Sequence, residues 1–300
     1  MEQVEKAIFI FTPSHMQQQY LEYVFDSIAK HISIPYQFCL FTDKVRDDFE
    51  SKHDVIVKIV SDEDHDKLKA LYFKEGRGDI PAFSAYAQLI MPRYFTEYTS
   101  FIYMEVDQIV RGDLKPLWAS CEQSGSALAA AAFLDDDYVR TTVDSFNRVS
   151  PGAKCYNTGV LYVDTKQWLA MGFEEKCFKE VSLQKESYGK RLDYYAQGAL
   201  NNALHSYIRE IDQKYNLPGF GSVRGISSDV INEAKVLHWT GPRKAWAENG
   251  LYKDLYYSDE ALRNEEDYTL SFPYLSLLKI KFKRTVRNIF RTVNLLVSAK

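Results

Sequence analysis

Two carboxylates stand close together in residues 101–114, FIYMEVDQIVRGDL. The first four residues are apolar and predict a buried strand, and Glu105 and Asp107 follow on either side of Val106. Side chains alternate faces along a strand, and open α/β sheets place ligands at the carboxyl ends of their strands. Two oxygen ligands there suit a divalent cation that also holds substrate phosphates. Taken alone, however, the tripeptide is better explained as a solvated turn.

An imidazole and an ammonium group far along the chain could complete such a site. His238 lies in the apolar run VLHW, and Lys244 follows six residues later. Two carboxylates and one imidazole are a reasonable ligand set for Mn²⁺, which would bind substrate phosphates and stabilise negative charge that develops on them. Lys244 adds positive charge there, and Gly241 lets backbone approach closely. By itself, His238 is more simply explained as a structural histidine.

Apolar runs that predict strands alternate with helical patterns along most of the chain. Their spacing favours a parallel sheet with crossover helices, and no linker or repeat divides it, so we expect one α/β domain over residues 1–270. Ser84 is a candidate N-cap. Strands are expected at residues 6–11, 36–42, 54–60, 101–104, 127–133, 157–163 and 236–239, and helices at 17–31, 84–95, 117–123, 174–188 and 197–206 and from Thr165.

Composition and charge exclude several classes of protein. Residues 271–300 hold seven Lys or Arg and no acidic residue, so the remainder has 30 basic against 41 acidic residues, a charge of −11. Such a body argues against nucleic-acid binding. The four separated cysteines favour a reducing compartment over a disulfide framework. The acidic start is no signal peptide, and no stretch is long enough to span a bilayer, so we expect a cytoplasmic protein.

The last segment, residues 271–300, is expected to be a separate basic tail. Lys279, Lys283, Arg287 and Arg291 recur every four residues beside an apolar stripe at helical spacing. A basic amphipathic helix over residues 275–300 suits an anionic lipid surface, so we expect attachment to the inner face of the cytoplasmic membrane. The alternative is that this helix packs on the acidic body.

Four segments, in order and spacing, resemble glycosyltransferase family 8, which includes glycogenin and bacterial lipooligosaccharide galactosyltransferases. They are MEVDQIVRGDL (104–114), YNTGVLYVDTKQW (156–168), YAQGALN (195–201) and VLHWTGPRKAW (236–246). The family's typical strings are D-x-D before a G-D-L turn, F-N-[SA]-G-V, D-Q-D-x-L-N and H-[FYW]-x-G-x-x-K-P-W. The resemblance covers about residues 5–250. It implies a GT-A fold, a mixed and mostly parallel sheet flanked by helices.

The resemblance also implies roles for individual residues. The metal, Mn²⁺ or Mg²⁺, would be held by Glu105, Asp107 and His238. The catalytic residues would be Gln197 near the anomeric carbon, Asp135 on the sugar hydroxyls and Lys244 on the diphosphate. A UDP-sugar donor would meet the helix 84–95 and these residues: Phe11, Thr12, Glu105, Val106, Asn157, Gly159, Gly241 and Lys244. Singly, Asn157 also fits a turn-capping residue, and Gln197 a solvent-facing one.

Some positions depart from the family strings. Glu105 is one methylene longer than the usual Asp, so its contact could run through water or to the ribose. Ala196 and Gly198 replace the carboxylates that flank Gln197. The family usually has a basic residue in the donor helix, but Gln88 stands at that position here. Arg93 or Arg77 could serve instead.

These features predict a metal-dependent transferase that moves a hexose, with retention at the anomeric carbon, to a surface glycan such as lipooligosaccharide or capsule. The expected mechanism is front-face, with the leaving phosphate oxygen taking the acceptor proton. Two alternatives stay open. One is a glycogenin-like transferase that modifies itself or a protein, since the chain has 21 Tyr. The other is a nucleotide-sugar-binding scaffold without turnover, motivated by Ala196 and Gly198.

Overall fold

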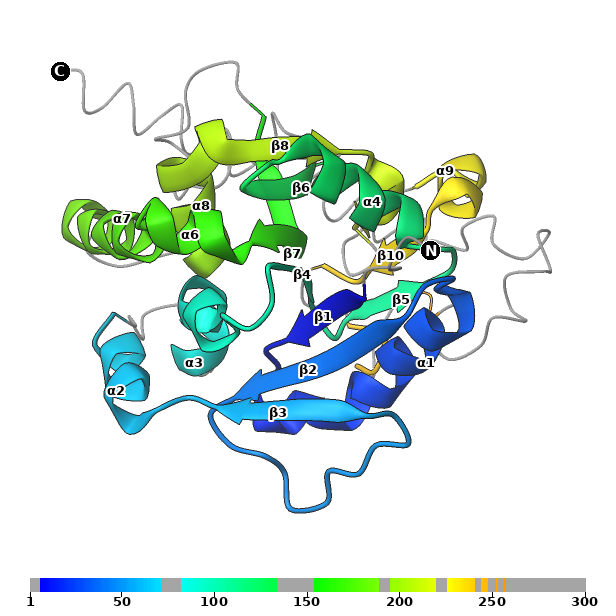
Figure 1. Cartoon of the computed structure of the whole chain (residues 1–300), viewed down its shortest axis with the longest axis horizontal. Coiled ribbons are helices and arrows are strands. Elements are labelled where there is room, and N and C mark those ends of the chain that lie inside the picture. The colour runs from blue at the N-terminus through cyan, green and yellow to red at the C-terminus, as the bar shows by residue number, and fades with distance from the viewer. Residues whose placement is uncertain are drawn as a thin grey trace, which may run out of the picture.

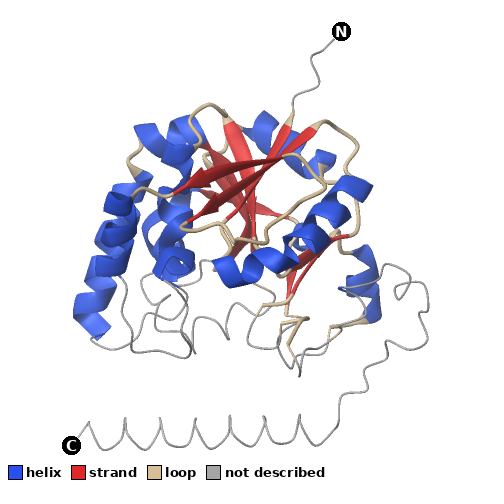
Figure 2. Ribbon diagram, turned by 90° about the horizontal axis from the view of Figure 1, so that it is seen from below, coloured by secondary structure: helices blue, strands red, loops and turns tan. Residues whose placement is uncertain are grey.

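The computed structural model describes residues 6–71, 82–133, 154–188, 195–219, 226–240 and 244–247, together with Tyr252 and Tyr256. These residues form two sheets enclosed by helices, as Figures 1 and 2 show. The expected α/β class, mixed and mostly parallel, is confirmed. Two predicted site residues, Asp135 and Gly241, lie outside the described residues, as does the basic tail.

The main sheet has seven strands in the order β3-β2-β1-β4-β7-β6-β8. Neighbouring strands run parallel, except that β7 is antiparallel to both β4 and β6. Because β7 runs against its neighbours, its N-terminal half lies beside the carboxyl end of β4. The strands are β1 (Ala7–Phe11), β2 (Tyr36–Thr42), β3 (Val55–Ile59), β4 (Ser100–Met104), β6 (Leu128–Ala132), β7 (Tyr156–Asp164) and β8 (Ile208–Ile211).

A second, three-stranded sheet brings distant parts of the chain together. Its order is β5-β10-β9, with β5 (Gln108–Val110), β9 (Leu217–Pro218) and β10 (Val236–His238). β10 is antiparallel to β5, and His238 lies opposite Gln108 in the register. The Trp239 N–H also donates to the Asp107 carbonyl at 2.8 Å. This pairing therefore fixes His238 beside the residue that precedes β5.

Helices cover both faces of the main sheet, and side chains alternate between them. On one face, Phe25 of α1 stacks on Phe38 at 4.3 Å and meets the edge of Phe11 at 5.1 Å. On the other, Phe83 of α3 packs against Phe41 at 5.3 Å. The helices are α1 (Leu21–His31), α2 (Asp62–Leu71), α3 (Ala82–Ile90), α4 (Lys115–Ser124), α6 (Thr165–Ala170), α7 (Phe173–Tyr188), α8 (Tyr195–Leu204) and α9 (Ser228–Glu233).

The structure corrects some local predictions. Ser84 is not an N-cap, because α3 begins at Ala82 and Ser84 is its third residue. The sequence patterns also missed five elements: α2, α9, β5, β8 and β9. α2 is mostly charged, and the three strands are short, so neither periodicity nor an apolar run marks them. Within the described part of the chain, every helix is too short or too polar to traverse a bilayer.

Candidate functional site

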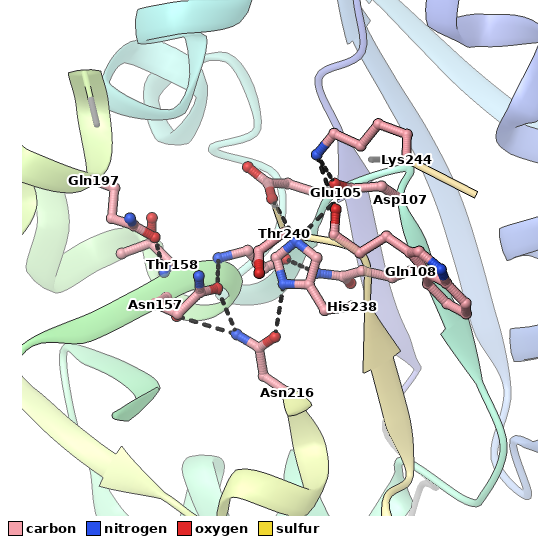
Figure 3. A network of polar contacts seen from close by, with 12 residues as sticks. Glu105, Asp107, Gln108, Asn157, Thr158, Gln197, Asn216, His238, Thr240 and Lys244 are labelled. Carbon is pink, nitrogen blue, oxygen red and sulfur yellow. Dashed lines mark hydrogen bonds and ion pairs between the residues drawn. The ribbon is translucent and has the colours of Figure 1, made fainter. Parts of the chain in front are cut away.

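Glu105, Asp107 and His238 converge at the carboxyl end of β4. One ligand atom from each lies within 4.8 Å of the others. The His238 Nε2 atom is 2.9 Å from Glu105 Oε2 and 3.4 Å from Asp107 Oδ1. Figure 3 shows the two carboxylates and the imidazole grouped where β4, β5 and β10 meet. The three residues expected to share a site therefore do lie together.

The two carboxylates differ in exposure. The chain bends after Met104, and the Asp107 side chain is 5% exposed, whereas that of Glu105 is 44% exposed. The Glu105 N–H donates to the Gly159 carbonyl at 3.0 Å, which holds the bend against β7. Asp107 is thus fixed inside the protein, while Glu105 lines the edge of the site.

The His238 ring is also fixed by a hydrogen bond at its other nitrogen, Nδ1. Nδ1 lies 2.9 Å from Asn216 Oδ1, and the ring is 1% exposed. No hydrogen bond from the described residues reaches Nε2 with acceptable geometry, although this atom is buried. A buried imidazole nitrogen that faces two carboxylate oxygens offers, with them, a ligand set that fits a divalent cation bound among the three residues. The donor set of two oxygens and one imidazole nitrogen suits Mn²⁺ or Mg²⁺.

The charged groups of this cluster shift one another's pKa values. Burial alone would lower the pKa of His238, but the carboxylates of Asp107 and Glu105 outweigh it and raise that pKa to about 9. Burial alone would raise the pKa of Asp107, yet Lys244 and His238 hold it well below its usual range. Asp107 is therefore a carboxylate at neutral pH, ready to bind a cation.

Lys244 contacts the same carboxylate. Its Nζ donates to Asp107 Oδ2, and to the Trp239 carbonyl at 3.1 Å. Trp246, two residues on, stacks on Tyr20 with ring centroids 4.1 Å apart and planes 11° apart. The segment 244–247 is thereby tied to the body beside the carboxylates, with its ammonium group at the site.

Gly159 of β7 is enclosed by the cluster. A Cβ atom placed on it would lie 2.2 Å from His238 Cε1 and 2.8 Å from Glu105 Oε2. Its carbonyl accepts a hydrogen bond from the Gln108 side chain at 2.7 Å. The N-T-G string therefore ends in glycine because any side chain would collide with a rigid ring and a carboxylate.

Two buried asparagines link β7 to His238. Asn157 Oδ1 accepts from the Gly159 N–H at 3.0 Å, and Asn216 Nδ2 donates to the same oxygen at 2.9 Å. Among the described residues no hydrogen bond uses the Nδ2 group of Asn157, which leaves this donor for a ligand. Asn157, expected at the donor sugar, thus adjoins the cluster.

Gln197 contacts Thr158, the residue of β7 that follows Asn157. Its Oε1 accepts from the Thr158 N–H at 2.9 Å, while Gln88 on α3 bonds both the Thr158 carbonyl at 2.8 Å and its hydroxyl at 3.1 Å. Ala196 and Gly198, on either side of Gln197, are buried. Gln197 and Gln88 therefore both border β7 close to Asn157, as Figure 3 shows for Gln197.

The remaining residues predicted to contact the sugar donor offer it mainly main-chain atoms. Phe11 is buried in the core at the end of β1, so only its main chain could meet a base. Thr12 follows it and donates to the Tyr103 hydroxyl at 3.3 Å. The Val106 carbonyl accepts from the Tyr256 hydroxyl at 3.1 Å, and its side chain is buried.

Arg93 does not take the place of the basic donor-helix residue. It pairs with Asp64 at 2.5 Å and with Glu174 at 2.9 Å, joining α2 to α7. Both partners hold its guanidinium away from any substrate role. The other candidate, Arg77, lies outside the described residues.

Sequence reasoning missed Asn216 and Gln108. Asn216 is fully buried and bonds residues 59 and 22 positions away. No motif marks it, because its partners become neighbours only when β9 and β10 form the second sheet. A second group of possible ligands is formed by Glu22 and Asp26 of α1 with His53 of the loop before β3, and there Lys52 already pairs with Asp26 at 2.7 Å.

Comparison with known proteins identifies a family and several relatives that the chain resembles. The family model for Glycosyl transferase family 8 matches residues 15–250. The chain is 26% identical over 212 residues to lipopolysaccharide 1,2-glucosyltransferase of Escherichia coli, covering 65% of this chain and 58% of that protein. It is 26% identical over 165 residues to "Probable galacturonosyltransferase 7" of Arabidopsis thaliana, covering 54% of this chain but only 26% of that protein. The matched part of the chain thus spans less than two thirds of the length of either relative.

A solved structure agrees with the fold. The galactosyltransferase LgtC, in complex with donor and acceptor sugar analogues, superposes with a TM-score of 0.65 at 16% identity, covering 90% of this chain and 99% of that one. At this identity the likeness shows the fold alone, which is the GT-A arrangement expected from the sequence.

Proposed function

The chain belongs to glycosyl transferase family 8, and on that premise we propose that it is a metal-dependent transferase that moves a hexose from a UDP-sugar to a glycan acceptor. The observation that carries the proposal is the convergence of three side chains that can ligate a metal: the buried Nε2 atom of His238 lies 2.9 Å from a Glu105 carboxylate oxygen and 3.4 Å from an Asp107 carboxylate oxygen. A metal ion there would supply positive charge to the two phosphates of the donor.

The metal would be held by Asp107 and His238, with Glu105 as the third and more adaptable ligand. Asp107 and His238 are rigid because backbone bonds of β5 and β10 tie them together. The half-exposed Glu105 can contact the ion directly or through water. Mn²⁺ and Mg²⁺ both accept this ligand set.

Lys244 would stabilise the leaving diphosphate. Its ammonium bonds Asp107, one of the residues that would hold the metal, and would therefore lie close to phosphates bound there. A positive group aimed at an oxygen on which negative charge develops lowers the barrier of the transfer step. Gly241, three residues earlier, is proposed to allow the close approach of backbone to the same phosphates.

The sugar would lie against β7 and the start of α8. Asn157 offers an Nδ2 donor that the described residues do not use, and Gln197 is proposed beside the anomeric carbon. Asp135 is proposed as the partner of the sugar hydroxyls. No carboxylate flanks Gln197, where Ala196 and Gly198 stand, so we propose front-face transfer with retention, in which the leaving phosphate oxygen takes the acceptor proton.

The acceptor is proposed to be a bacterial-type surface glycan, such as lipooligosaccharide or capsule. The similarity to an Escherichia coli lipopolysaccharide glucosyltransferase supports this choice, and a membrane-bound acceptor would suit the basic tail, residues 271–300, on the inner face of the cytoplasmic membrane. The second candidate is a nucleotide-sugar-binding scaffold, which Ala196 and Gly198 favour. A glycogenin-like transferase acting on a Tyr is the third.

A donor screen tests the proposal. The full chain is incubated with Mn²⁺ and a panel of UDP-, GDP- and ADP-sugars, and release of nucleoside diphosphate is measured with and without glycan acceptors. Release from a UDP-hexose that stops when EDTA is added is expected. Binding without release for every donor and acceptor would favour the scaffold, and release unaffected by EDTA would overturn metal dependence. NMR of the product linkage tests retention, and an inverted anomer would contradict it.

A further inference from the structure

Asn216 joins the two halves of the site. It follows the short helical turn Gln213–Tyr215, and it is completely buried. Its amide group contacts Asn157 on one side and His238 on the other, at 2.9 Å in each case. Figure 3 shows it between β7 and β10, below the imidazole. One side chain thus touches both the expected sugar contact and the expected metal ligand.

The direction of each hydrogen bond follows from the backbone of β7. The Gly159 N–H can only donate, so the atom of Asn157 that faces it is the oxygen Oδ1. That oxygen and the Asn157 carbonyl, at 2.9 and 3.2 Å, are both acceptors, so Asn216 must present its Nδ2 group to them. Its Oδ1 then faces His238, and Nδ1 of His238 must carry a hydrogen.

The geometry therefore points to Asn216 as a positioning residue that keeps the His238 hydrogen on Nδ1 and so leaves Nε2 to bind the metal. Because Asn157 sets the orientation of the Asn216 amide, the His238 tautomer depends on Asn157 as well. This inference rests on the proposed function. A histidine that binds a metal through one nitrogen needs a partner on the other to fix its ring and tautomer. Here the partner is an amide whose own orientation is set by a strand backbone rather than by a carboxylate.

Two substitutions at Asn216 separate its two contacts. Asn216→Ala removes both of them. Asn216→Asp keeps an oxygen that accepts from His238 Nδ1, but it replaces the Nδ2 donor with an oxygen that faces the Asn157 oxygens. The matched control is Asn201→Ala: Asn201 is also fully buried and bonds the Tyr156 N–H and carbonyl on the same strand, without touching His238.

Mn²⁺ affinity of the full chain is measured by titration calorimetry without any donor, after circular dichroism has verified folding. Asn216→Ala should weaken binding about 10–100-fold, whereas Asn201→Ala should bind as the wild type does. Asn216→Asp should keep Mn²⁺ affinity within about threefold of the wild type, yet raise the KM for the donor about tenfold because Asn157 is displaced. Wild-type affinity in folded Asn216→Ala would overturn the inference.

A second measurement uses the wild-type protein and therefore does not require any variant to fold. In the Mg²⁺-loaded wild type, a long-range proton–nitrogen NMR spectrum should show the His238 hydrogen on Nδ1, and a hydrogen on Nε2 would overturn the inference. If the wild type binds neither Mn²⁺ nor Mg²⁺, the metal dependence in the proposed function fails together with this inference. If it binds metal but Asn216→Ala changes nothing, only the role of Asn216 fails.

Discussion

Gly159 and His238 approach each other so closely that no side chain fits between them. A Cβ on Gly159 would lie 2.2 Å from Cε1 of the imidazole, well inside the contact distance of two carbon atoms. The glycine belongs to β7 of the main sheet and the histidine to β10 of the second sheet. The contact therefore sets how closely the two sheets pack at the site.

Gly159→Ala should push the imidazole away from the carboxylates. We expect a destabilisation of about 1–3 kcal/mol from overpacking and a loss of Mn²⁺ affinity of about tenfold or more, measured by thermal denaturation and calorimetry. Gly112→Ala is the matched control. Its Cβ would lie 2.3 Å from the Lys235 side chain, which can move aside, so neither quantity should change much. Unaltered Mn²⁺ affinity in Gly159→Ala would contradict the expected role of this contact.

Asp107 and Glu105 should contribute unequally to metal binding. Asp107→Asn removes a buried charge in contact with His238, so we expect Mn²⁺ affinity to fall about 100-fold or more and donor turnover to be lost. Glu105→Gln should cost about tenfold or less, because water can reach this half-exposed position. Asp26→Asn is the control in the other acidic cluster and should bind Mn²⁺ normally. Equal losses in the first two variants would refute the ranking.

Lys244→Met should separate turnover from metal binding. The ammonium bonds Asp107, so its removal should leave Mn²⁺ affinity unchanged or slightly higher. The kcat for donor cleavage should fall about 10²–10³-fold, as when a single group that stabilises developing negative charge is lost. Lys52→Met, which breaks a surface pair with Asp26, is the control. A normal kcat in Lys244→Met would rule out a role at the diphosphate.

Asp64 should stabilise the fold in a pH-dependent way. The hydrogen bond from Arg93 outweighs burial and, with Tyr94, holds the pKa of Asp64 well below its usual value. A depressed folded-state pKa gives stability that is present above the unfolded-state pKa of about 4 and is lost as pH falls through the folded value. Asp64→Asn should lower the free energy of unfolding by about 1.5–3 kcal/mol at pH 7.

The difference between Asp64→Asn and the wild type should shrink as the pH falls below about 4, which urea denaturation at several pH values can measure. Asp66→Asn, with a carboxylate that is exposed on the same helix, should change stability by less than about 0.5 kcal/mol. A difference independent of pH would mean that the Asp64 charge does not stabilise the fold.

The basic tail should bind anionic membranes. Reversing the charges of Lys279, Lys283, Arg287 and Arg291 to Glu should weaken sedimentation with phosphatidylglycerol-containing vesicles by about 100-fold or more, since each basic residue near such a surface contributes about 1 kcal/mol. Phosphatidylcholine vesicles are the control, because the electrostatic part is absent there. Equal sedimentation of the two proteins with the anionic vesicles would reject membrane attachment through this charge.

Much of the fold could be predicted because local pattern and burial agree there. β2 has the predicted bounds, residues 36–42, and β1, β4, β6 and β7 differ from theirs by one residue at one or both ends. These strands lie inside the sheet, are almost wholly buried and each contain an apolar run, so their sequence carries the signal directly. The polar helix α2 and the short strand β8 carried no such signal. Their stability comes from packing against neighbours rather than from their own periodicity.

The sequence alone determined which chemical groups could form the site, because carboxylates, an imidazole and an ammonium stand in motifs of recognisable spacing. It could not determine how they are held. The tertiary structure decided that Asp107 is buried while Glu105 is half-exposed, and that Arg93 belongs to an ion-pair network. It also brought Asn216 between Asn157 and His238. The physical reason is that orientation and burial depend on contacts between strands far apart in the chain, which no local pattern encodes.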